Sequence, residues 1–176
     1  LRLQADLCGT KEGCNEGDCG ACTVIVTGRD GVPRPMNACI LFLPQLQGCS
    51  VRTVEGLSGP DGALHPVQEA MITHHGAQCG FCTPGFVTTM AAAHATGETD
   101  FDAALAGNLC RCTGYAPIIR AAQAAAQRPA PSWMNERPEP QALKRRDAIF
   151  SPKSPDELAH WYDRNTKHPL TPARPR

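Results

Sequence analysis

Ten cysteines stand out in this sequence of 176 residues, and eight of them form two groups of four. The first group has the spacing C-x4-C-x2-C with a distant fourth member, and it consists of Cys14, Cys19, Cys22 and Cys39. This spacing is typical of [2Fe–2S] clusters, because three thiolates on one tight loop take three ligand positions and a remote cysteine takes the fourth. Gly17 and Gly20 permit positive φ and close backbone approach, so amide N–H groups can point at the sulfurs.

The second group combines a C-x2-C pair with a C-x-C pair further along the chain, and it consists of Cys79, Cys82, Cys110 and Cys112. Two adjacent pairs on two loops can close a second site of four thiolates. A C-x-C pair is unusual for structural zinc, whose knuckles space their cysteines by two to four residues. Zinc sites are the first alternative. Disulfides are the second, disfavoured because pairs so close in sequence rarely make good bridges and no secretory feature supports them.

Charge and composition exclude several classes of protein. The chain has 17 Lys+Arg against 17 Asp+Glu, and this neutrality argues against binding to nucleic acid or to an anionic membrane surface, which need a basic excess. No apolar run approaches the length that spans a bilayer. The N-terminus carries no signal segment, and closely spaced cysteines without one indicate a reducing, cytoplasmic protein in which they bind metal.

The first cysteine group lies in a part of the chain with short periodicity. Residues 23–26 are β-branched and predict a strand, residues 28–31 predict a turn, and residues 37–43 form a second apolar run that Pro44 closes. This half is expected to be a small β-rich domain.

From His65 the periodicity becomes helical. The pattern predicts four short helices: from Pro66 to about Gly76, from Thr83 to about Gly97, over residues 101–109 with Asp100 as N-cap, and over residues 117–126. The second cysteine group falls in the loops between them. The overall fold class is therefore α+β.

Four motifs in order carry a resemblance to a known family. They are Gly9–Val24 around the first cysteine loop, Leu64-His65-Pro66-Val67-Gln68, Gln78-Cys79-Gly80-Phe81-Cys82-Thr83-Pro84-Gly85, and Gly107-Asn108-Leu109-Cys110-Arg111-Cys112-Thr113-Gly114-Tyr115. Together they resemble the iron–sulfur part of the xanthine dehydrogenase (molybdenum hydroxylase) family, and most closely the small iron–sulfur subunit of its bacterial members. The resemblance covers residues 7 to 127.

The resemblance implies a fold and a function. Residues 1–56 would be a β-grasp [2Fe–2S] ferredoxin-type domain, incomplete at its N-terminus, and residues 57–127 a four-helix bundle that holds a second [2Fe–2S] cluster. Electrons would pass from a molybdopterin centre on a large partner subunit through both clusters toward FAD and NAD. Gln78 and Cys112 match family positions that contact the pterin. The chain would carry electrons and no catalytic residue.

The tail differs in composition. The last 49 residues contain no Gly or Cys, nine of the 16 prolines and a net charge of +4, so residues 128–149 are expected to be a linker. Residues 150–176 resemble the start of the family's FAD domain, or are a disordered tail. No glycine-rich phosphate loop is present, so FAD is expected on another domain or subunit.

Some residues and functions remain as alternatives. Cys8 and Cys49 are expected to be structural, and His74 and His75 to cap a helix end rather than to bind metal. The alternative functions are the small subunit of another molybdenum hydroxylase, of the carbon monoxide, aldehyde or isoquinoline dehydrogenase type, and a non-redox metal-binding module.

Overall fold

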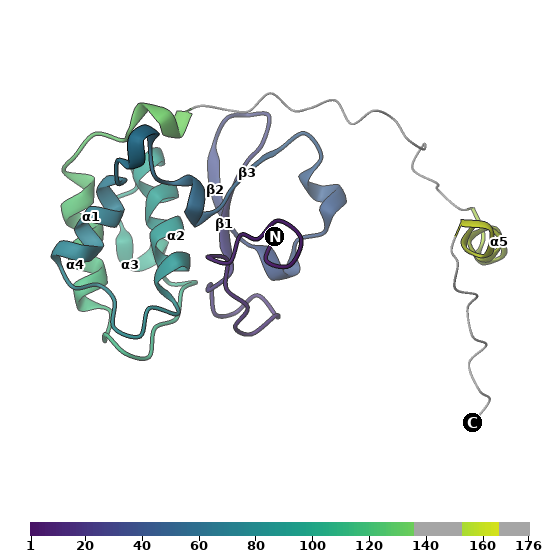
Figure 1. Ribbon diagram of the computed structural model, residues 1–176, viewed down its shortest axis with the longest axis horizontal. Coiled ribbons are helices and arrows are strands. Elements are labelled where there is room, and N and C mark those ends of the chain that lie inside the picture. The colour runs from purple at the N-terminus through teal and green to yellow at the C-terminus, as the bar shows by residue number, and fades with distance from the viewer. Residues whose placement is uncertain (136–152, 166–176) are drawn as a thin grey trace. The chain divides into compact units, whose positions relative to one another are not determined.

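The computed structural model describes residues 1–135 and 153–165. The chain divides into a compact unit of residues 1–140 and a second unit of residues 141–176. The first unit combines a three-stranded sheet with helices α1 to α4 (Figure 1). This agrees with the α+β class expected from the sequence.

The sheet is antiparallel and has the strand order β2-β1-β3. Its strands are β1 (Thr23–Thr27), β2 (Pro33–Asn37) and β3 (Ser50–Arg52). The central strand β1 is the β-branched segment predicted from the sequence, and it is buried on both faces, since Val24 is 1% and its neighbour Ile25 2% exposed. A β-branched run buried in this way is what a covered central strand requires.

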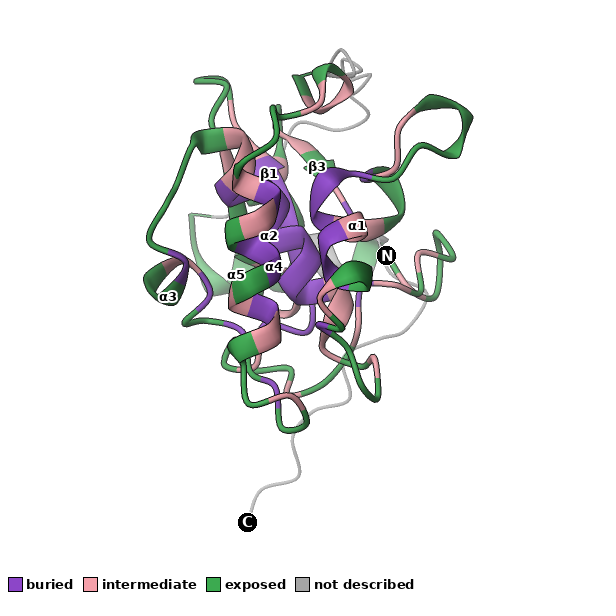
Figure 2. Cartoon of the chain, turned by 90° about the vertical axis from the view of Figure 1, so that its left-hand side faces the viewer, coloured by how far each residue is buried: buried purple, intermediate pink, exposed green. Residues whose placement is uncertain are grey.

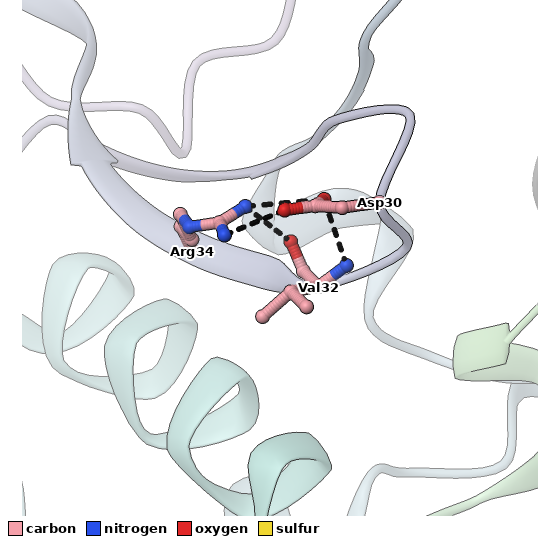
Figure 3. Close-up of polar contacts among 3 residues, drawn as sticks. All are labelled: Asp30, Val32 and Arg34. Carbon is pink, nitrogen blue, oxygen red and sulfur yellow. Dashed lines mark hydrogen bonds and ion pairs between the residues drawn. The ribbon is translucent and has the colours of Figure 1, made fainter.

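The turn between β1 and β2 is held by Asp30 (Figure 3). Its carboxylate accepts a hydrogen bond from the backbone N–H of Val32 at 3.2 Å and pairs with the Arg34 guanidinium at 2.6 Å. Such an Asx-type contact is a common way to stabilise a tight reversal. This turn sets the register, in which Thr27 pairs with Pro33.

The apolar run 37–43 does not form a strand. The hairpin register places the returning strand at Pro33–Asn37, and the chain then makes short 3-10 turns at Ala38–Ile40 and Leu43–Leu46. Phe42 and Leu43 remain exposed. Because the turn at residues 28–32 fixes where pairing begins, the apolar run comes too late in the chain to pair with β1.

The four helices of the first unit are α1 (Pro66–Thr73), α2 (Thr83–Thr96), α3 (Phe101–Ala104) and α4 (Ala116–Ala126). The predicted starts at Pro66 and Thr83 are confirmed, and Gly97 ends α2 in the left-handed conformation with φ 72°. The Asp100 carboxylate caps α3 by accepting from the Ala103 N–H at 3.1 Å. These are ordinary helix start and stop signals.

Two helix ends differ from the prediction. Helix α3 stops at Ala104 rather than near residue 109, because the following residues turn so that the Asn108 side chain reaches Gly20. Helix α1 stops at Thr73, and the left-handed residue is His75 (φ 54°) rather than Gly76. His74 and His75 therefore end a helix, as expected.

Helix α2 lies between the sheet and the other helices, and its residues from Gly85 to Ala93 are all buried. Figure 2 shows the buried residues gathered in α1, α2, α4 and β1. Phe86 and Met90 of α2 belong to the same apolar cluster as Ile25 of β1 and Ile118 of α4. A helix that is apolar on all sides must be packed against other elements on all sides. Here one continuous apolar core joins the β-rich and helical halves. The boundary between residues 56 and 57 therefore stays a prediction.

The chain beyond α4 stays in contact with the first unit as far as it is described. Ser132–Asn135 form a 3-10 turn in which the Trp133 indole N–H donates to the Leu57 carbonyl at 3.1 Å. Trp133 therefore packs within this chain. Residues 136–149 of the expected linker lie outside the described residues.

In the second unit, helix α5 spans Pro155–Asn165 and begins with a reciprocal cap. The Glu157 N–H donates to the Ser154 hydroxyl at 3.2 Å, and the Glu157 carboxylate accepts from the Lys153 N–H at 2.7 Å. Residues 150–152 and 166–176 lie outside the described residues. None of the helices in the described ranges is long and apolar enough to cross a bilayer.

Candidate metal centres

The first four-cysteine group lies on the loop before β1 and on the 3-10 turn after β2. Its thiols form two close pairs. The Cys19 backbone N–H donates to the Cys14 sulfur at 3.4 Å, and Cys22 lies close enough to Cys39 to raise the pKa of its thiol. The pairing of Thr23 with Asn37 brings the two ends of the group together: Cys22 directly precedes Thr23, its carbonyl accepts from the Ala38 N–H at 3.3 Å, and Cys39 is the next residue.

Backbone amides of the loop point at the Cys14 sulfur. Hydrogen bonds from the N–H groups of Glu16 and then Cys19 lower the pKa of Cys14 to about 6. Burial raises the pKa of Cys39, and its contact with Cys22 adds to that effect. The amides thus favour the thiolate that a metal needs at Cys14, as the glycine-rich loop predicted.

The second four-cysteine group brings together the start of α2 and the loop between α3 and α4. The sulfurs of Cys79 and Cys112 lie 3.5 Å apart, and the thiols of Cys82 and Cys110 are close enough to shift each other's pKa. Each pair therefore takes one cysteine from each loop. Cys79 and Cys112 are exposed, whereas Cys110 is buried.

Burial and hydrogen bonding act in opposite directions on these thiols. Burial raises the pKa of Cys82 to about 12. Burial also pushes the pKa of Cys110 upward, but the Thr113 hydroxyl, 3.2 Å from its sulfur, and nearby backbone N–H groups lower it overall. The backbone N–H of Phe81 and the Cys112 thiol lower the pKa of Cys79. Thiolate formation is thus favoured at one member of each pair.

This pairing fits a diiron group better than a single ion. A [2Fe–2S] cluster has two irons, each held by two thiolates, so two pairs of thiols suit it. Structural zinc needs four ligands around one point. Within residues 1–135 and 153–165, no three His, Cys, Asp or Glu side chains converge closely enough to hold one metal ion. The donor set and its two-pair arrangement therefore fit [2Fe–2S] clusters at both groups.

The remaining cysteines lie apart from these pairs. The Cys8 thiol contacts Asp6 at 3.5 Å, and the Cys49 thiol contacts the Gln45 carbonyl at 3.9 Å. All ten cysteines are free in this structure.

Among the residues around the second group, Gln78 was predicted from the sequence, whereas Asn108 and Tyr115 were not singled out. Gln78 is exposed beside the exposed pair of Cys79 and Cys112. The Tyr115 hydroxyl accepts from the Cys110 N–H at 3.0 Å, and Asn108 is buried with only 4% exposure. Both Asn108 and Tyr115 belong to the fourth quoted motif. A polar residue two positions before a ligand cysteine is a signal that could have marked Asn108.

The family model for a [2Fe-2S] binding domain matches residues 53–123, which include the whole second group. The xanthine dehydrogenase of Drosophila pseudoobscura pseudoobscura is 48% identical over 128 residues, which cover 68% of this chain and 10% of the relative. The aldehyde oxidase 1 of Oryctolagus cuniculus is 49% identical over 130 residues, 69% of this chain and 10% of the relative. This chain thus spans about a tenth of the length of these relatives.

A solved structure matches over most of both chains. In the crystal structure of quinoline 2-oxidoreductase from Pseudomonas putida 86, one chain is 41% identical, with a TM-score of 0.63 over 72% of this chain and 78% of that chain. The identity is high enough, and the shared length great enough, to show common family membership rather than a shared fold alone. With its [2Fe-2S] domain match and these relatives, the chain belongs to the molybdenum hydroxylase family, in its iron–sulfur region.

Proposed function

We propose that this chain is the electron-transfer part of a molybdenum hydroxylase, most closely of the xanthine dehydrogenase kind, and that it holds two [2Fe–2S] clusters. The observation that carries the proposal is the arrangement of each cysteine group as two close pairs, Cys14 with Cys19 and Cys22 with Cys39, then Cys79 with Cys112 and Cys82 with Cys110. Two thiolates for each of two irons is the ligand set of this cluster.

The chain's own residues would bind and tune the clusters. The first four cysteines would hold one cluster within a β-grasp domain (residues 1–56), and the last four would hold the other within a four-helix bundle (residues 57–127). Hydrogen bonds from loop amides to the sulfurs help to set a cluster's potential. When bound, such clusters accept and give up single electrons, whereas substrate oxidation would occur on a partner subunit.

The exposed edge of the second site supports a place for that partner. Gln78, Cys79 and Cys112 lie open to solvent, so a molybdopterin centre held by a large partner subunit could reach Gln78 and Cys112. Electrons would enter there and leave through the first site toward FAD and NAD. Because the tail has no glycine, we place FAD on another domain or subunit, with residues 128–149 as the linker. We also propose a cytoplasmic location.

A second candidate is the iron–sulfur subunit of another molybdenum hydroxylase. The similarity to an aldehyde oxidase and to quinoline 2-oxidoreductase favours it, since these match about as well as the xanthine dehydrogenases do. Both candidates predict the same two clusters in this chain. They differ in substrate, which a partner's pocket would select.

Anaerobic purification with iron, sulfide and zinc analysis tests the proposal, together with electron paramagnetic resonance (EPR) of the dithionite-reduced protein. We expect about four irons and four sulfides per chain and two distinct [2Fe–2S] signals. Zinc, or no metal, in the anaerobically purified protein would contradict the electron-transfer function. The partner is then sought by co-purification, with purine and aldehyde oxidation of the complex separating the two candidates.

A further inference from the structure

The two cysteine groups meet at a close backbone junction. The Gly20 backbone lies between Gly85, in the first turn of α2, and the loop at Gly107–Asn108. A Cβ built on Gly85 would lie 2.2 Å from the Gly20 carbonyl oxygen, and one built on Gly20 would lie 2.4 Å from the Gly107 carbonyl oxygen. Both distances are far below van der Waals contact, so only glycine allows this approach.

Asn108 closes the junction with side-chain hydrogen bonds in three directions. Its amide N–H2 donates to the Gly20 carbonyl at 3.0 Å and to the Thr23 hydroxyl at 3.3 Å, and its amide oxygen accepts from the Thr89 hydroxyl at 2.8 Å. The side chain thus links the first cysteine loop, the start of β1 and helix α2. A buried amide with these partners is rigidly held, because losing one would leave a buried polar group unpaired.

The next residue makes a bond that joins the two groups directly. The Leu109 N–H donates to the Cys19 carbonyl at 3.0 Å. Cys19 belongs to the first group, and Leu109 precedes Cys110 of the second. One hydrogen bond and the covalent bonds of Cys19, Leu109 and Cys110 therefore connect a sulfur of one site with a sulfur of the other.

We propose that Asn108 is a positioning residue for electron exchange between the two sites, because it holds the Leu109 N–H against the Cys19 carbonyl. This inference rests on the proposed function. In each exchange the second site loses one electron and the first site gains one, with no bond broken and no proton transferred. Electron tunnelling through protein falls steeply with each gap that replaces a bond, so loosening this hydrogen bond slows the exchange.

The test measures the exchange itself in the full chain with both clusters loaded. A photoreductant delivers less than one electron per molecule, and freeze-quench EPR follows how the two cluster signals reach equilibrium. We expect the exchange to be slowed most in Asn108→Ala, which removes all three side-chain bonds. Thr89→Val removes the bond to the amide oxygen and the contact of the same hydroxyl with the Gly85 carbonyl of its own helix at 3.0 Å, and it should slow the exchange less.

Thr88→Val is the matched control. Thr88 is also a buried threonine of α2, but its hydroxyl donates only to the Pro84 carbonyl of the same helix, at 2.7 Å. The rate of electron exchange between the two clusters in Thr88→Val should equal that of the wild type. Hydrogen exchange at the Leu109 amide, measured by mass spectrometry, should rise in Asn108→Ala and Thr89→Val and stay unchanged in Thr88→Val.

The outcomes separate this inference from the proposed function. Wild-type protein without two clusters overturns both. Unchanged electron exchange in fully loaded Asn108→Ala overturns the inference alone. If Asn108→Ala fails to fold or loses a cluster, Thr89→Val decides: slowed exchange with wild-type iron content supports the inference, and wild-type exchange overturns it. An equal slowing in Thr89→Val and Thr88→Val also overturns it, because the effect would then be one of helix packing.

Discussion

The two cysteine groups arrive at the same two-pair arrangement from different local structures. The first group takes three of its members from one loop, whose backbone turns through positive φ at Asn15, Gly17 and Gly20. The second group takes two members from each of two loops, which helix packing brings together from positions far apart in the sequence. The first site therefore depends on local backbone conformation and the second on tertiary packing, and the sites should respond differently to the same kind of substitution.

Loss of a ligand should have the largest effect and should be confined to one site. We expect Cys14→Ser to remove only the first cluster and Cys79→Ser to remove only the second, because each substitution removes one cysteine of a close pair. The iron content should fall by half in each, and a different EPR signal should vanish. Cys8→Ser is the control and should keep both signals, since Cys8 belongs to neither group. Loss of both signals in either single variant would contradict the independence of the two sites.

Glycine substitutions should separate backbone crowding from backbone conformation. Gly20→Val places a branched side chain against the Gly107 carbonyl at a position with φ 68°, so we expect it to prevent insertion of the first cluster and to cost about 2–4 kcal/mol of unfolding free energy. Gly17→Val, at φ 88° but against only the flexible end of Ile40, should also block that cluster with a smaller loss of stability.

Gly80→Ala provides the comparison in the second site. Gly80 has φ 83° with nothing within 4 Å of an added Cβ, so only conformational strain of about 1 kcal/mol is expected. Iron analysis and urea unfolding measure both effects. Full iron content in Gly20→Val would contradict the argument from crowding.

Acid should destabilise the helical half through His65, which is fully buried at the start of α1. Burial, together with the nearby His94, Arg128 and Arg52, lowers its pKa from 6.5 to about 4. Between pH 6.5 and about 4, His65 is protonated in the unfolded chain but neutral in the folded chain. The contribution of His65 to the free energy of unfolding is therefore fully present above pH 6.5 and is lost as the pH falls toward 4. The loss should be on the order of 3 kcal/mol.

Urea unfolding at several pH values tests this, with His65→Asn as the reference. Asn can accept the Val67 N–H that the His65 ring accepts at 3.1 Å, so it keeps the helix cap without the titration. The variant should have a flatter dependence of unfolding free energy on pH. A wild-type slope equal to that of His65→Asn would rule out His65 as the cause.

The smallest effect concerns a single helix cap. Asp100→Ala removes the carboxylate that accepts from the Ala103 N–H, and we expect a loss of about 1 kcal/mol of unfolding free energy. Because α3 leads into the loop that carries Cys110, the second EPR signal should broaden while the first stays unchanged. Asp100→Asn is the control, because asparagine is also a good N-cap residue. Its thermal unfolding and its EPR signals should match those of the wild type.

Prediction from sequence succeeded where a local signal decides the structure. The β-branched residues of β1, the prolines that open α1 and α2, the Asp100 cap and the left-handed Gly97 are all local. It did not identify residues 33–37 as the returning strand β2, and it was wrong about the end of α3, where a contact of Asn108 with Gly20, 88 residues away, stops the helix. The turn at residues 28–32 decided where β2 begins, and only the end of α3 was decided by a residue distant in the sequence.

The sequence by itself determined which cysteines form the two groups, because ligand spacing is a property of the chain, and it determined the membership of the family through four ordered motifs. Only the tertiary structure decided which cysteines lie side by side, Cys79 with Cys112 and Cys82 with Cys110, and that Asn108 joins the two sites. The reason is physical: these contacts arise when α2, the sheet and the loop before α4 bury one common core, and no local pattern encodes where separate elements meet.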